Sequence, residues 1–146
     1  MRVLVDADGC PVVDITIRIT KGHGCQCFLL CDSAHYLDRE DATTLTVSIG
    51  KDSVDHVLAN MLQPGDIVVT ADYGLAALCL AKRARPISPD GLLYTDENIG
   101  GLLEQRHLAQ QIRRAGERLS SMPKRTEAQN TAFGAALSKL LGESSK

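Results

Sequence analysis

Short apolar runs alternate with segments long enough to form a helix, and this alternation constrains the fold more than any other feature of the chain. Continuous apolar strands joined by helical connections are typical of a parallel sheet that is buried on both faces. The runs that we assign to strands cover residues 2–5, 25–31, 45–49 and 66–71, with a shorter one near Ile87. They predict an α/β fold with a mainly parallel central sheet.

The segments between and after these runs favour helices. One of them is ambiguous, because Ile15, Ile17 and Ile19 alternate as they would in a strand. Pro11 suits the first turn of a helix, however, and two parallel strands need a crossover connection, so we predict a helix there. The full set of predicted helices covers residues 12–21, 53–62, 75–84, 96–115 and 126–141. The last two make the C-terminal section helical.

The length and composition are those of one ordinary domain. A chain of 146 residues, with 44% hydrophobic and 23% charged residues, can bury an adequate core without disulfides. We predict a single domain over residues 1–146, with residues 119–126 as an internal linker before the last helix. No apolar run approaches the roughly 20 residues of a membrane span, and no signal segment is recognisable, so we expect a cytoplasmic protein without membrane contact.

The five cysteines are odd in number and lie at positions 10, 25, 27, 31 and 79. The cluster of Cys25, Cys27 and Cys31 lacks the C-x-x-C spacing of zinc sites and falls in an apolar run. Cysteine behaves there as a small hydrophobic residue, and Cys10 also suits a packing role. We therefore expect buried thiols in a reducing compartment rather than metal ligands or disulfides.

Three aspartates follow two of the predicted strands at the point where each strand ends. Asp6 and Asp8 come after the first strand, and Asp72 comes after the fourth. The carboxyl ends of neighbouring parallel strands meet at one edge of the sheet, where open α/β proteins bind ligands. Carboxylates about 4 Å apart repel by roughly 4 kcal/mol at an effective dielectric constant near 20, so a cation or a proton must neutralise them. A set of oxygen ligands favours Mg²⁺ or Mn²⁺.

Two further aspartates, Asp52 and Asp55, follow the third strand. They lie three positions apart near the start of a predicted helix, where Asp55 is a candidate fourth metal ligand and Asp52 an additional candidate. The alternative is that both only interact with the helix dipole, and that Asp6 and Asp72 only cap the helices that follow them. The sequence leaves these interpretations open.

Basic residues gather between Arg106 and Arg125, although the net charge of the chain is −2. Arg106, Arg113 and Lys124 are candidate contacts to a phosphodiester backbone, because a local basic face can bind nucleic acid without a basic chain overall. A solvated helix surface would carry the same charges. The charge pattern does not separate these alternatives.

Three segments together carry a family resemblance. They read V-D-A-D-G-C-P-V at residues 5–12, P-G-D-I-V-V-T-A-D at residues 64–72, and L-Y-T at residues 93–95 followed by Asn98-Ile99. With Arg106, this combination resembles the YaiI/YqxD family of bacterial proteins over nearly the whole chain. That family is regarded as related to PIN-like domains, which are metal-dependent nucleases with an acidic site on a parallel sheet. The resemblance implies a three-layer PIN-like fold.

The resemblance also implies roles for individual residues. Those that match the acidic motifs of the family and would be catalytic are Asp6, Asp8 and Asp72. The same three residues and Asp55 would bind Mg²⁺ or Mn²⁺, and Asp52 falls in the same central stretch. RNA is implied as a partner more than DNA. Tyr73-Gly74 departs from the Ile-Pro that is usual in the family.

Three functions fit these residues. The first is a Mg²⁺- or Mn²⁺-dependent phosphodiesterase of the ribonuclease type. The second is a phosphatase similar to the haloacid dehalogenases, whose first motif resembles residues 3–9 and in which Asp6 would form an aspartyl-phosphate, although Cys10-Pro11 departs from that motif. The third is a catalytically inactive domain that binds RNA or another partner.

Overall fold

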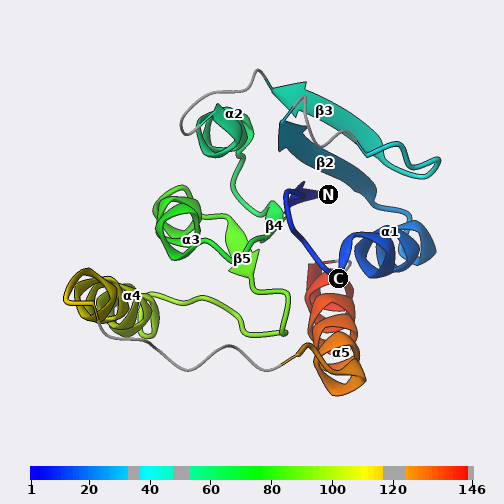
Figure 1. Ribbon diagram of the computed structural model, residues 1–146. Coiled ribbons are helices and arrows are strands. Elements are labelled where there is room, and N and C mark those ends of the chain that lie inside the picture. The colour runs from blue at the N-terminus through cyan, green and yellow to red at the C-terminus, as the bar shows by residue number, and fades with distance from the viewer. Residues whose placement is uncertain (33–36, 48–52, 117–123, 145–146) are drawn as a thin grey trace.

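The computed structural model of the chain describes residues 1–32, 37–47, 53–116 and 124–144. Its centre is a sheet of five parallel strands in the order β3-β2-β1-β4-β5 (Figure 1). The strands are β1 (Arg2–Asp6), β2 (Gln26–Asp32), β3 (Thr43–Val47), β4 (Ile67–Val69) and β5 (Arg85–Ile87). The helices are α1 (Val13–Gly22), α2 (Ser53–Met61), α3 (Tyr73–Ala81), α4 (Ile99–Arg114) and α5 (Glu127–Ser144). The predicted α/β fold with a parallel sheet is confirmed.

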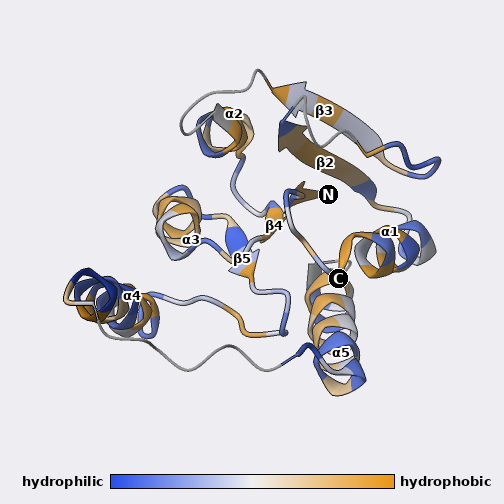
Figure 2. Ribbon diagram, viewed as in Figure 1, coloured by the Kyte–Doolittle hydropathy of each residue, from blue (hydrophilic) through white to orange (hydrophobic). Residues whose placement is uncertain are grey.

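Strand β1 lies at the centre of the sheet and is covered on both faces. Successive side chains of a strand point to opposite faces. Val3 and Val5 accordingly pack in one core with residues of α1 and α5, whereas Leu4 packs in a second core with residues of α2 and α3. Figure 2 shows the hydrophobic residues concentrated on β1, β2 and β4 between these helices. This layered arrangement is consistent with a PIN-like domain.

The ambiguous segment after Pro11 is a helix, as predicted. The buried residues of α1 recur every three or four positions, at Val13, Thr16, Ile17 and Thr20. The two buried threonine hydroxyls are satisfied within the helix, because Thr16 donates to the carbonyl of Val12 at 2.7 Å and Thr20 donates to that of Ile17 at 2.9 Å. The isoleucines that suggested a strand therefore lie around a helix.

Helix α4 lies outside the two layers that cover the sheet (Figure 1). It packs mainly on α3, and none of its residues is fully buried. We predicted that this helix begins at residue 96, which was wrong, because Thr95 and Asn98 close a turn before it. The amide of Thr95 donates to Oδ1 of Asn98 at 2.9 Å, and the amide of Asn98 donates to Oγ1 of Thr95 at 3.2 Å.

The cysteines are free thiols. Cys27 and Cys31 are buried on β2, and Cys79 is buried on α3. These positions agree with the expected packing role. As a separate finding, no helix within the described ranges is long and apolar enough to cross a membrane.

Candidate functional site

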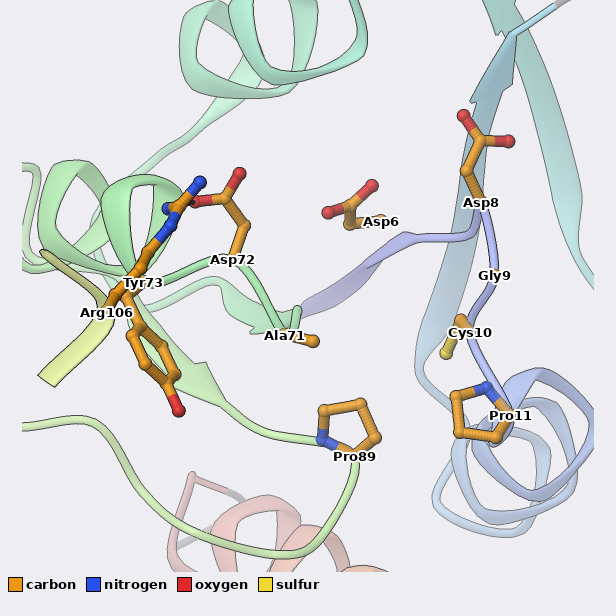
Figure 3. Close-up of a pocket in the computed structure, with 10 residues that line it drawn as sticks. All are labelled: Asp6, Asp8, Gly9, Cys10, Pro11, Ala71, Asp72, Tyr73, Pro89 and Arg106. Carbon is orange, nitrogen blue, oxygen red and sulfur yellow. Dashed lines mark hydrogen bonds and ion pairs between the residues drawn. The ribbon is translucent and has the colours of Figure 1, made fainter. Parts of the chain in front are cut away.

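A pocket lies at the carboxyl edge of the sheet, beyond the ends of β1 and β4 (Figure 3). The two strands are neighbours, with Val5 paired to Val69, so the residues that follow them reach the same edge. The cavity has a volume of about 410 Å³ and is lined by Asp6, Asp8, Gly9, Cys10, Pro11, Ala71, Asp72, Tyr73, Pro89 and Arg106. Three predicted acids and one predicted base therefore line a single pocket.

Asp6 is a half-buried acid of this pocket. The hydroxyl of Thr70 donates to its Oδ2 at 3.0 Å. Burial, and to a smaller extent the negative charges of Asp55, Asp72 and Asp8, raise the pKa of Asp6 to about 6, against the opposite effect of the Thr70 hydrogen bond. The three other predicted acids in the described residues therefore act electrostatically on Asp6.

Asp72 both caps α3 and lines the pocket, and the sequence alone did not distinguish these two interpretations. Its Oδ1 caps α3, because it accepts from the amides of Gly74 at 2.8 Å and Leu75 at 3.1 Å. Arg106 also approaches this oxygen, at 3.5 Å from its guanidinium. The other oxygen, Oδ2, makes no hydrogen bond to any residue that the structure describes. The capping interpretation is thus correct for Asp72, and it leaves one carboxylate oxygen available to a ligand.

The capping interpretation does not hold for Asp6. Helix α1 follows Val12 and begins without a side-chain cap. The carboxylate of Asp6 turns instead toward Thr70 at the end of the neighbouring strand. Asp6 therefore contacts a residue at the edge of the sheet and does not cap the next helix.

Asp8 also lines the pocket, whereas Asp55 is not among the residues that line it. Asp8 is exposed in the loop after β1, and its Oδ2 accepts from the amide of Asp32 at 3.4 Å. Asp55 is half-buried in the first turn of α2, and its charge contributes to the raised pKa of Asp6. Asp52 lies outside the described residues.

The carboxylates are not gathered around a common point. Among the residues that the structure describes, no three His, Cys, Asp or Glu side chains lie close enough together to hold a metal ion. The donor set nevertheless suits a hard divalent cation, because all four predicted ligands in this part of the chain are carboxylates. A cation here would remove the repulsion that raises the pKa of Asp6.

Of the three predicted basic residues, one lines the pocket. Arg106 lines the pocket, with its side chain 50% exposed. Arg113 is exposed seven positions later on α4, and Lys124 is exposed before α5. Neither of these two lines the pocket. Their contact with nucleic acid stays a prediction.

Thr70 is a residue of the site that we did not predict from the sequence. It is 1% exposed, and its Oγ1 donates to Asp6 and accepts from the amide of Asp72 at 3.0 Å. The carbonyl of Thr70 accepts in turn from the hydroxyl of Tyr94 at 3.0 Å. The available signal was a hydroxyl side chain that closes an apolar run two positions before an acid.

Comparison with known proteins agrees with these motifs. The profile of the family described as "Uncharacterized BCR, YaiI/YqxD family" matches residues 4–143. A "UPF0178 protein" of Exiguobacterium sibiricum is 50% identical over 143 residues, which cover 98% of each chain. One of Ruminiclostridium cellulolyticum is 47% identical over 137 residues, which cover 94% of this chain and 90% of the relative. No solved structure matches. On this basis, the chain belongs to the YaiI/YqxD family of bacterial proteins.

Proposed function

We propose that this protein is a Mg²⁺- or Mn²⁺-dependent phosphodiesterase that acts on RNA. The observation that carries the proposal is that Asp6, Asp8 and Asp72 line one pocket with Arg106. Carboxylates that hold a cation beside a guanidinium group that binds phosphate are the groups that phosphodiester hydrolysis needs. The YaiI/YqxD family, to which the chain belongs, is regarded as related to PIN-like nucleases, and this resemblance supports the same activity.

Each acid has a role in this proposal. Asp6 and Asp72 would bind the metal directly, and Asp8 and Asp55 would bind it directly or through water. When bound, the metal would polarise the scissile phosphate and lower the pKa of a water molecule. Thr70 would orient the carboxylate of Asp6, because its hydroxyl donates a hydrogen bond to Oδ2 of that carboxylate.

Arg106 would bind a phosphate oxygen of the substrate. Its present partner, Asp72, is 3.5 Å away and the guanidinium is half exposed, so the ion pair contributes less than about 1 kcal/mol. The arginine can therefore exchange this weak contact for a phosphate at little cost. A metal on Asp72 would favour that exchange, because it neutralises the carboxylate.

The test is hydrolysis of end-labelled RNA by purified protein with Mn²⁺, Mg²⁺ or EDTA. Single-stranded and structured RNAs are compared with DNA of the same sequence. We expect metal-dependent cleavage of RNA, which falls by at least about 100-fold in Asp6→Asn and Asp72→Asn. Asparagine keeps an oxygen that can accept from Thr70 at position 6 and can cap α3 at position 72, so both variants should fold. Asp96→Asn, an exposed aspartate outside the pocket, is the control.

Other outcomes select other functions. Cleavage that persists unchanged in Asp6→Asn would contradict the proposal. An aspartyl-phosphate trapped on Asp6 would select the phosphatase. RNA binding without turnover under either metal would select an inactive binding domain.

A further inference from the structure

The pocket has two chemically different sides (Figure 3). In that view, the carboxylates of Asp6 and Asp72 lie on the upper side with the guanidinium of Arg106. The rings of Tyr73 and Pro89 lie on the lower side. With a cation bound to the two carboxylates, a ligand that fills such a pocket would place an anionic part on the first side and a flat apolar part on the second.

The ring of Tyr73 is held in place from behind. It packs edge to face against Tyr94, with ring centroids 5.9 Å apart and an angle of 66° between the planes. Tyr94 is buried, and its hydroxyl donates to the carbonyl of Thr70. These contacts fix the Tyr94 ring against which Tyr73 packs. Tyr73 is only half-buried. The chain has five aromatic residues, and among those described Tyr73 is the one that lines this pocket.

The loop that carries Pro89, on the same apolar side of the pocket, is also held in place. Arg125 donates to the carbonyl of Pro89 at 2.6 Å and to Oδ1 of Asp90 at 2.7 Å, which ties the loop after β5 to the start of α5. Gly91 lies so close to α5 that a Cβ atom there would be 2.8 Å from the carbonyl oxygen of Ala132. Both apolar walls are therefore preorganised, which reduces the entropic cost of binding a flat ligand.

We propose that the pocket binds one nucleotide unit, with its base stacked on Tyr73 beside Pro89 and its phosphate on the side of Asp72 and Arg106. The position of the phosphate rests on the proposed function, whereas the stacking surface rests on the geometry of the rings. Stacking on an aromatic ring tolerates any base, because every base has a π-face. The ligand class is thus a nucleotide rather than a sugar phosphate or a polyphosphate.

The experiment compares two ligands that share a phosphate and differ in the base. Adenosine 5′-monophosphate and ribose 5-phosphate are titrated calorimetrically into the full chain in the presence of Mg²⁺. We expect the nucleotide to bind at least about 10-fold more tightly. In Tyr73→Leu that preference should disappear while the affinity for ribose 5-phosphate stays unchanged, and in Tyr73→Phe the preference should persist because the ring remains.

The unchanged affinity for ribose 5-phosphate shows that Tyr73→Leu is folded. A second measurement needs no variant: in NMR spectra of the wild-type complex, the base protons of the nucleotide should give cross-peaks to the Tyr73 ring. Equal affinity of the wild type for both ligands, or a preference that survives in Tyr73→Leu, would overturn the inference. A Tyr73-dependent preference without RNA cleavage would overturn only the proposed hydrolysis, and cleavage without the preference would overturn only the stacking.

Discussion

The hydroxyl of Thr70 donates a 3.0 Å hydrogen bond to Oδ2 of Asp6, across the boundary between two neighbouring strands. The hydroxyl oxygen of Thr70 also accepts from the amide of Asp72, two residues further along the chain. One buried side chain thus sets the positions of two carboxylates that no local sequence pattern relates. The first prediction tests this link.

Thr70→Val keeps the shape of the side chain and removes both hydrogen bonds. We expect Mn²⁺ affinity, measured by calorimetry, and RNA hydrolysis to fall by about 10- to 100-fold, as for other partners that orient metal ligands. The free energy of unfolding should fall by about 1–3 kcal/mol, because a buried amide loses its acceptor. Thr70→Ser restores the hydroxyl and should recover most of the Mn²⁺ affinity. Wild-type affinity in the valine variant would exclude an orienting role.

Asp6→Asn should stabilise the metal-free protein at neutral and alkaline pH. The pKa of Asp6 is raised from 3.8 to about 6 in the folded state, so between these values the folded state binds more protons than the unfolded state. The contribution of Asp6 to stability is therefore most favourable at low pH and falls as the pH rises through this window. A tenfold change in a protonation constant corresponds to about 1.4 kcal/mol, so the ionised carboxylate destabilises the fold by up to about 3 kcal/mol.

Urea unfolding in EDTA at pH 8 and pH 4 measures this effect. The stabilisation by Asp6→Asn should approach about 3 kcal/mol at pH 8 and stay below about 1 kcal/mol at pH 4, where most of the carboxyl is protonated in the folded state. Mg²⁺ at pH 8 should then stabilise the wild type more than the variant. A variant that is less stable than the wild type at pH 8 would contradict the prediction.

Arg106→Ala should weaken RNA binding without a large change in stability. The arginine is half exposed and its ion pair with Asp72 is long, so the unfolding free energy should change by less than about 1 kcal/mol. Loss of one phosphate contact should reduce the slope of log affinity against log salt concentration by about 0.7 for single-stranded RNA. Fluorescence anisotropy at several salt concentrations gives both quantities. Arg18→Ala, an exposed arginine on α1 outside the pocket, should leave the slope unchanged.

Gly91→Ala should destabilise the protein by about 2 kcal/mol or more. Gly91 has a φ of 89°, which L-residues rarely adopt, and its Cβ would meet backbone atoms of α5. The loop that carries Pro89 would have to move, so binding of a nucleotide to the pocket should weaken as well. Thermal unfolding followed by circular dichroism measures the first effect.

Gly101→Ala is the matched control for that variant. Gly101 lies in the first turns of α4, and a Cβ there meets no atom within 4 Å. Alanine favours a helix by up to about 1 kcal/mol relative to glycine, so this variant should be equally stable or more stable. Destabilisation of similar size at both positions would show that the close contact at Gly91 is not the cause.

Local patterns were sufficient to locate the sheet and its acidic edge. Apolar runs predicted the five strands because a parallel strand is buried on both faces. Successive positions of such a strand are therefore mostly apolar, and this pattern is visible in the sequence. Asp6 and Asp72 follow two of these strands, so they lie close together if the two strands are neighbours. The strands β1 and β4 are neighbours in the sheet. The start of α4 was not predicted, because the reciprocal hydrogen bonds of Thr95 and Asn98 depend on the conformation of a turn.

The surroundings of the acids depended on contacts between distant parts of the chain. Thr70 lies 64 positions from Asp6, Arg106 lies 34 positions from Asp72, and Arg125 lies 36 positions from Pro89. Such contacts follow from how helices pack on the sheet and on one another, and no periodicity along the sequence encodes them. The sequence therefore predicted an acidic edge on a parallel sheet and a basic candidate at Arg106, whereas packing placed that arginine at the edge and added the threonine and the aromatic wall that turn this edge into a pocket.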